Sequence, residues 1–129
     1  MNAPENKKIV IVDDDEDLLK SLTFILKSEG LEVQGFITGK EALDYLTKEE
    51  NINTCSLLIL DRLLPDMDGL DILRSLNATF LKHCPVLILS LLSSDKDILS
   101  GLTTGALDYI TKPFNLEIFT EKVKKLTGL

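Results

Sequence analysis

The sequence predicts an α/β fold in which one parallel five-stranded sheet lies between two layers of helices. Three observations lead to this prediction. Short apolar runs of strand length alternate along the chain with amphipathic segments of helical period. Two of these runs end directly in aspartate, as a buried parallel strand does when it presents a carboxylate at its tip. The 129 residues suit one domain, and right-handed βαβ connections then give a three-layer α/β/α sandwich.

The composition is that of an acidic globular domain. Hydrophobic residues make up 44% of the chain and charged residues 27%, which is typical of soluble proteins. The net charge of −7 argues against direct nucleic-acid binding, because that normally needs a basic face. No apolar run approaches the ~20 residues that span a bilayer, and the chain opens without the apolar segment of a signal peptide. We therefore expect a cytoplasmic protein with no membrane partner.

The chain is expected to begin with a strand and a helix. Residues 1–6 are polar and are predicted to be a frayed end. Lys8–Val12 contains four β-branched residues in a row, which favours a strand. A helix should begin at Asp15–Asp17, because acids favour the N-terminal end of the helix dipole, and Gly30 should end it.

A second strand, a second helix and a third strand follow. Glu32–Phe36 is short and alternating, as a strand near the sheet edge would be. Lys40–Leu46 has apolar residues at helical spacing. The polar segment 47–54 then leads to Leu57–Leu60, an apolar run that is typical of a fully buried central strand.

A tight turn at Pro65 and Gly69 separates this strand from a third helix. That helix is predicted at Leu70–Leu76. The fourth strand, Val86–Ser90, is another apolar run, and it ends in a residue that can form hydrogen bonds.

Ser94 and Asp97 have the spacing of a capping box for a fourth helix, which is expected to run through Leu102. Leu107–Ile110 is the predicted fifth strand. The last helix should cover Leu116–Leu126, since its apolar residues lie on one face.

Polar residues follow four of the predicted strands. Asp13 and Asp14 follow the first strand, Asp61 the third, Ser90 ends the fourth, and Lys112 follows the fifth. In an open α/β sheet such residues converge where the strand order reverses. Three neighbouring carboxylates raise one another's pKa, and a divalent cation relieves the repulsion. An all-oxygen set that leaves room for phosphate suits Mg²⁺, with Mn²⁺ as a possible substitute.

This group of residues predicts phosphoryl chemistry. Asp61 can be the nucleophile that takes a phosphoryl group as an aspartyl phosphate. The hydroxyl of Ser90 and the ammonium of Lys112 can contact phosphoryl oxygens. Taken singly, Asp13–Asp15 could be a helix N-terminus, Asp61 a turn residue and Lys112 a surface lysine. Their joint placement at the ends of strands favours the phosphoryl site.

Four segments, VDDDEDLL, LILDRLLPDMDGLDIL, PVLILS and GALDYITKPF, carry a family resemblance. In these segments, and over nearly its whole length, the chain resembles the receiver domain of two-component response regulators, the CheY-like family. The resemblance implies the flavodoxin/CheY-like fold, with strand order 2-1-3-4-5 and five helices. It also implies a single receiver domain over residues 1–129, with its core at about 8–127.

Carried over by position, the resemblance implies roles in the acidic pocket. Asp61 would be the phosphoacceptor and would also contact Mg²⁺. Asp14 would ligate the ion directly, and Asp13 would complete the pocket partly through water. The backbone carbonyl of Leu63 would be a further ligand.

The resemblance implies a switch as well. Ser90 would be the switch hydroxyl, Lys112 the phosphate-binding lysine, and Tyr109 the aromatic side chain that turns inward when Ser90 moves. The Lys112–Pro113 peptide bond is expected to be cis, because it commonly is in this family.

A sensor histidine kinase or a phosphotransfer protein is the implied partner. Its phosphohistidine would phosphorylate Asp61, and slow hydrolysis would reset the domain, which is otherwise not an enzyme. Phosphorylation would change the face formed by the fourth helix, fifth strand and fifth helix. A homodimer through that face is possible, although Leu107 and Lys122 stand where dimerising regulators often have aspartate and arginine.

Two positions depart from the family pattern. Leu91 follows the switch hydroxyl where a small residue is usual, with Leu92 behind it, so a bulky side chain could narrow access to Asp61. Arg62 directly follows the phosphoacceptor where an apolar residue is common. We expect Arg62 to point to the other face of the strand and to pair with an acid.

Other functions stay open. A pseudo-receiver would keep the fold as an interaction module without being phosphorylated. The bulky Leu91 leaves this alternative open. An aspartate-nucleophile phosphatase is disfavoured because Leu63 occupies the usual position of its general acid. A nucleotide-binding domain is disfavoured because acid, and no glycine-rich loop, follows the first strand. Cys55 and Cys84 are expected to be reduced and structural, and His83 to be a loop residue.

Overall fold

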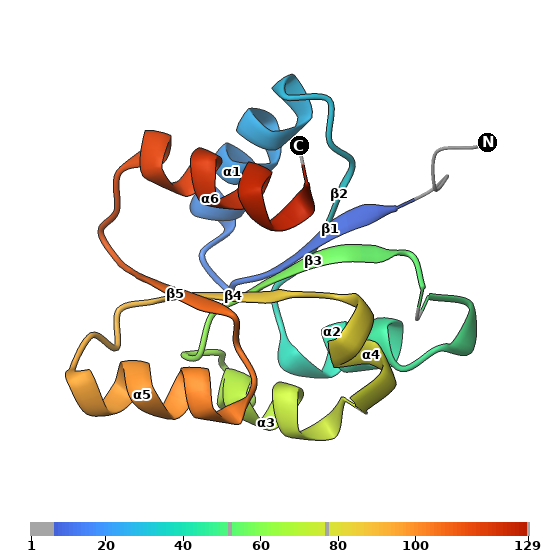
Figure 1. The fold of residues 1–129 in the computed structure, drawn as a ribbon, viewed down its shortest axis with the longest axis vertical. Helices are drawn as coiled ribbons and strands as arrows, with labels where there is room; N and C mark the ends of the chain where they lie inside the picture. Colours follow the sequence, from blue (N-terminus) through green and yellow to red (C-terminus); the bar gives the residue numbers. More distant parts are fainter. Residues whose placement is uncertain (1–6, 52, 77, 129) are drawn as a thin grey trace.

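A computed structural model of the chain describes residues 7–51, 53–76 and 78–128. They form a parallel five-stranded sheet with helices on both faces (Figure 1). The strands are β1 (Lys8–Val12), β2 (Val33–Phe36), β3 (Cys55–Leu60), β4 (Val86–Ser90) and β5 (Asp108–Thr111). Their order is β2-β1-β3-β4-β5, which confirms the prediction and places the reversal of strand order between β1 and β3.

Helices α1 and α6 cover one face of the sheet, and the other helices cover the opposite face (Figure 1). In the described ranges the helices are α1 (Glu16–Ser28), α2 (Gly39–Leu46), α3 (Gly69–Ser75), α4 (Ala78–His83), α5 (Asp95–Thr104) and α6 (Leu116–Thr127), with a short 3-10 turn at Glu49–Asn51. The predicted fourth and fifth helices are thus α5 and α6. The predicted capping box at the start of α5 is confirmed.

The prediction of five helices is wrong because it missed α4. This helix has six residues, too few to show a clear helical period or to be stable by propensity alone. Tertiary packing supports it, since Phe80 is 1% exposed in the core. His83, which was expected in a loop, is the last residue of α4, and its Nδ1 lies 2.9 Å from the carbonyl oxygen of Thr79.

The central strands are apolar throughout because both of their faces are buried. Alternate residues of β1 belong to two separate cores: Ile9 and Ile11 pack beneath α1 and α6, whereas Val10 and Val12 pack on the other face. The edge strand β2 is only partly buried, which agrees with its alternating sequence.

The two cysteines meet where β3 and β4 begin. Both are free and buried, and the thiol of Cys84 donates a hydrogen bond to Sγ of Cys55 at 2.9 Å. This bond and burial raise the pKa of Cys84, so its sulfur stays protonated at neutral pH. The pair lies at the opposite ends of these strands from Asp61.

Asp66 ties the loop after β3 to the start of α2. Its carboxylate accepts hydrogen bonds from the backbone amides of Gly39 (2.8 Å) and Lys40 (2.9 Å). These bonds hold the pKa of Asp66 below its ordinary value of 3.8. Because the pKa of Asp66 is lower in the folded state than in the unfolded state, its ionised carboxylate stabilises the fold. This contribution is fully present when the pH is above the unfolded pKa, and it is lost as the pH falls through the folded pKa.

Asp66→Asn should therefore lower the free energy of unfolding at pH 7, because an amide oxygen replaces a charged acceptor at a helix N-terminus. Its difference from wild type should shrink as the pH falls below about 4. Urea unfolding between pH 3 and 7 measures both effects. Asp44→Asn is the control, because Asp44 pairs with Lys40 at the exposed surface of α2. A difference that does not change with pH would show that the charge of Asp66 is unimportant.

Candidate functional site

The predicted polar residues lie together at the carboxyl ends of the strands. Asp13 follows β1, Asp61 follows β3, Ser90 ends β4, and Lys112 follows β5. The backbone amide of Asp61 donates to Val12 at 2.9 Å, so the ladder of hydrogen bonds continues into the site. Asp13, Asp61 and Ser90 are at most 4% exposed. Such burial of polar groups requires partners.

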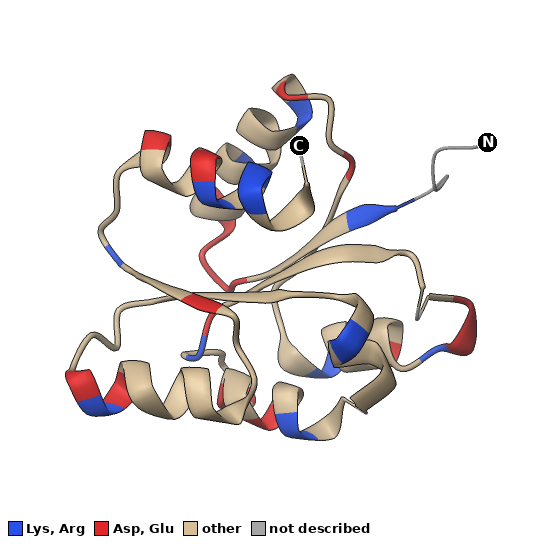
Figure 2. Ribbon diagram, in the orientation of Figure 1, with Lys and Arg blue, Asp and Glu red and all other residues tan. Residues whose placement is uncertain are grey.

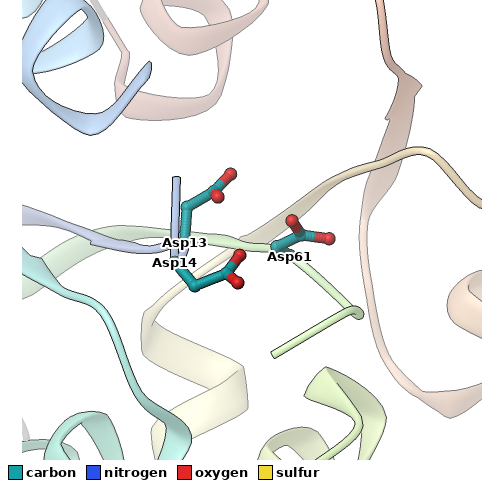
Figure 3. Close-up of side chains that lie close together, drawn as sticks. All are labelled: Asp13, Asp14 and Asp61. Atoms are coloured by element: carbon teal, nitrogen blue, oxygen red, sulfur yellow. The ribbon is translucent and has the colours of Figure 1, made fainter. Parts of the chain in front are cut away.

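Three carboxylates form a possible metal site at this edge. Oxygen atoms of Asp13, Asp14 and Asp61 all lie within 4.8 Å of one another. Figure 3 shows the three side chains at the ends of β1 and β3. Asp13 and Asp61 are buried and Asp14 is exposed, so the cluster is open to solvent on one side. An all-oxygen set of this kind fits Mg²⁺, which binds few carboxylates and retains water. Within the described residues, no other such group of acidic, histidine or cysteine side chains occurs.

Lys112 bridges the two buried acids. Its Nζ donates to Oδ2 of Asp13 at 2.8 Å and to Oδ2 of Asp61 at 2.9 Å. Burial lowers the pKa of Lys112, but the bonds to both carboxylates outweigh it, and the net pKa is raised. Burial raises the pKa of Asp13, against the opposing effect of Lys112. Lys112 therefore stays charged and compensates the acids. The Lys112–Pro113 bond is cis, as the family resemblance implied.

The loop after β3 closes tightly around Asp61. The backbone amide of Leu63 donates to Oδ1 of Asp61 at 3.1 Å. The amide of Gly69 donates to the carbonyl of Arg62 at 2.9 Å, which returns the chain to the end of β3. The use of the Leu63 carbonyl as a metal ligand stays a prediction.

Ser90 and Tyr109 meet at the same residue, Leu92. The hydroxyl of Ser90 accepts from the Leu92 amide at 3.2 Å, and the Tyr109 hydroxyl donates to the Leu92 carbonyl at 2.6 Å. A contact common to both was not visible in the sequence. Leu91 is 62% exposed, and its effect on access to Asp61 stays a prediction.

Arg62 is buried and pairs with acids, as expected. Its guanidinium lies 3.3 Å from Asp68, the N-cap residue of α3. Nη1 donates to the backbone carbonyl of Asp97 in α5 at 3.1 Å. Burial alone would lower the pKa of Arg62, but its hydrogen bonds to Asp68 help to outweigh this, and the net pKa is raised. The sequence predicted an acidic partner for Arg62 without identifying it as Asp68 or Asp97.

Charge is unevenly distributed around this edge. Figure 2 shows acidic residues along the connection from β1 to α1 and at the start of α5. On the face expected to support a dimer, Lys122 pairs with Asp108 of β5 at 2.6 Å, and Leu107 is 64% exposed. Dimerisation through this face stays a prediction. No helix in the described part of the chain has the length and apolar character to cross a membrane.

Comparisons with known proteins agree with this geometry. A family model described as response regulator receiver domain matches residues 9–124. Regulatory protein VanRc from Enterococcus gallinarum is 41% identical over 110 residues, which cover 85% of this chain and 45% of VanRc. The chain thus spans less than half the length of this curated relative.

Solved receiver structures share the fold. The BeF3-activated receiver domain of DrrB is 36% identical, with a TM-score of 0.82 over 95% of this chain and 98% of that chain. A two-component response regulator from Clostridium difficile is 29% identical, with a TM-score of 0.81 over 93% of this chain and 94% of that chain. Sheet order, acidic cluster and family match agree, and the chain belongs to the response regulator receiver domain family of two-component systems.

Proposed function

We propose that this chain is a phosphorelay receiver in which Asp61 accepts a phosphoryl group from the phosphohistidine of a sensor histidine kinase or a phosphotransfer protein. The observation that carries this proposal is the meeting of Asp61 with Asp13, Asp14 and Lys112 at the carboxyl ends of the strands. Membership of the receiver family supports it, since these domains are signalling phosphoacceptors that work with such partners.

In the proposed reaction a carboxylate oxygen of Asp61 attacks the phosphorus atom. The bond from phosphorus to the histidine nitrogen breaks, and the aspartyl phosphate forms. Asp13, Asp14 and Asp61 would hold Mg²⁺ or Mn²⁺ with the carbonyl of Leu63, and the ion supplies charge neutralisation at the phosphoryl oxygens.

Two donors of the chain complete this proposed site. Nζ of Lys112 already donates to Asp61 at 2.9 Å, so it can transfer this bond to a phosphoryl oxygen. The hydroxyl of Ser90 can donate to another phosphoryl oxygen. Water then slowly hydrolyses the aspartyl phosphate while these residues hold it, and this hydrolysis resets the receiver.

The proposed readout starts at Leu92. If Ser90 turns toward a phosphoryl group, its bond to the Leu92 amide is released, while Tyr109 still holds the Leu92 carbonyl. The loop between β4 and α5 must then rearrange, and Tyr109 with it. The face made by α5, β5 and α6 changes, which alters binding of an output partner or of a second copy.

Intact mass spectrometry after incubation with acetyl phosphate tests the phosphoryl transfer. We expect wild type to gain one phosphoryl group only when Mg²⁺ is present, because the acids need a cation to admit an anion. Asp61→Asn should show no gain, since it lacks the nucleophile. Asp44→Asn, an exposed change on α2, should behave as wild type. A folded wild type that stays unmodified would instead support the pseudo-receiver alternative.

A further inference from the structure

Arg62 connects the end of β3 to the first turn of α5. Its backbone is held in the loop after Asp61, where its carbonyl accepts from the amides of Leu64 and Gly69. Its side chain is 9% exposed and binds Asp68 through Nε and Nη2 at 3.4 and 3.3 Å. The remaining Nη1 donates to the Asp97 carbonyl at 3.1 Å and lies 3.9 Å from its carboxylate. One side chain therefore joins the loop after β3 to the start of α5.

The first turn of α5 is closely linked to the end of β4. Three residues separate Ser90 from Ser94, the N-cap residue of α5. Ser94 and Asp97 exchange hydrogen bonds in the capping box, from the Asp97 amide to the Ser94 hydroxyl at 3.0 Å and from the Ser94 amide to the Asp97 carboxylate at 3.3 Å. A displacement of this loop is thus passed directly to Asp97.

We propose that Arg62 is a positioning residue that restrains the first turn of α5 in the resting receiver and so limits how readily the phosphorylated form is reached. This inference rests on the proposed function, because it concerns the response to phosphorylation of Asp61. Arg62 follows β3, whereas Asp97 follows the loop after Ser90. When the loop moves toward the phosphoryl group, the bond from Arg62 to the Asp97 carbonyl lengthens or breaks.

A bond that exists only in the resting form lowers the population of the other form. A ligand that needs the other form then binds more weakly, in proportion to the population that is competent to bind it. Removing the guanidinium should therefore tighten binding of a phosphoryl mimic. If Arg62 served only to pack against its neighbours, its removal would weaken that binding or leave it unchanged.

The test uses the beryllofluoride anion with Mg²⁺ as the phosphoryl mimic, together with hydrogen exchange of the free protein. We expect Arg62→Met to bind beryllofluoride about tenfold more tightly than wild type. This factor corresponds to ~1.4 kcal/mol of stabilisation that the resting form loses and the other form does not. Amides of residues 95–98 should exchange faster in this variant without any ligand.

Two further variants separate the restraint from general effects. Arg62→Lys keeps one charged donor, so its affinity for beryllofluoride and its exchange rate at residues 95–98 should lie between those of wild type and Arg62→Met. This variant also allows the test to be made if Arg62→Met folds poorly. Arg74→Met removes another arginine–aspartate pair, with Asp71 on α3, and should leave binding and exchange at 95–98 unchanged.

The outcomes are distinguishable. Unchanged exchange at 95–98 in both Arg62 variants would overturn the restraint, and so would faster exchange with equal or weaker binding of beryllofluoride. If wild type itself does not bind beryllofluoride with Mg²⁺, the proposed function fails and this inference fails with it. If wild type binds beryllofluoride and the Arg62 variants bind it no more tightly, this inference is refuted while the proposed function stands.

Discussion

Gly69→Ala is expected to lower the free energy of unfolding by about 3 kcal/mol, at the upper end of the usual cost of overpacking. A Cβ atom at this position would lie 2.2 Å from the carbonyl oxygen of Asp61 and 3.0 Å from Cα of Arg62. Both neighbours are backbone atoms of the closed loop after β3, so neither can rotate away. The loop must shift instead, and it carries the phosphoacceptor with it.

Urea unfolding of Gly69→Ala and Gly35→Ala gives a matched comparison. At Gly35, on the edge strand β2, the three atoms nearest to an added Cβ all belong to the side chain of Leu19, the nearest of them at 2.9 Å. A leucine side chain can adjust its rotamer, so we expect a loss below about 1 kcal/mol. Equal losses in the two variants would contradict the explanation by backbone contact. The folded fraction of Gly69→Ala should also be phosphorylated more slowly, because Asp61 is displaced.

Lys112→Met is expected to lower the free energy of unfolding at pH 7 by roughly 3 kcal/mol, as removal of one partner of a buried ion pair does. The variant leaves Asp13 and Asp61 without their shared cation, and their side chains are 2% and 5% exposed. Added Mg²⁺ should recover part of the loss, because a bound cation stabilises the folded state in proportion to its occupancy.

The loss caused by Lys112→Met should depend on pH with a definite sign. The pKa of Asp13 is already raised by burial, and removing the ammonium raises it further. Protonation of Asp13 then relieves the repulsion as the pH falls through this folded value, so the variant approaches wild type in acid. Chemical unfolding between pH 4 and 8, with and without Mg²⁺, measures both effects.

Lys122→Met is the control for this experiment. Lys122 also binds an aspartate, Asp108, at 2.6 Å, but both side chains are more than a third exposed. Solvent screens such a pair, so its loss should change the free energy of unfolding little. A comparable loss in both variants would show that burial of the acids is not the cause.

Local sequence patterns were sufficient for the strands and for the polar residues that follow them, whereas the strand order was implied by the family resemblance. The apolar run before Asp61 predicted a central strand buried on both faces, and the structure confirms this in β3. The capping box at Ser94 was predicted from two residues three positions apart, because the interaction is local. In contrast, α4 left no comparable signal, because its support is the burial of Phe80 against distant strands.

Sequence by itself determined the fold class and which polar residues follow the ends of strands, since both depend on the period and burial of neighbouring side chains. Only the tertiary structure decided which groups meet. Lys112 contacts Asp13 across 99 positions of sequence, Arg62 reaches Asp97 across 35, and Tyr109 holds Leu92 across 17. These partners depend on how separate elements pack, and no local pattern encodes the distance between atoms so far apart in the chain.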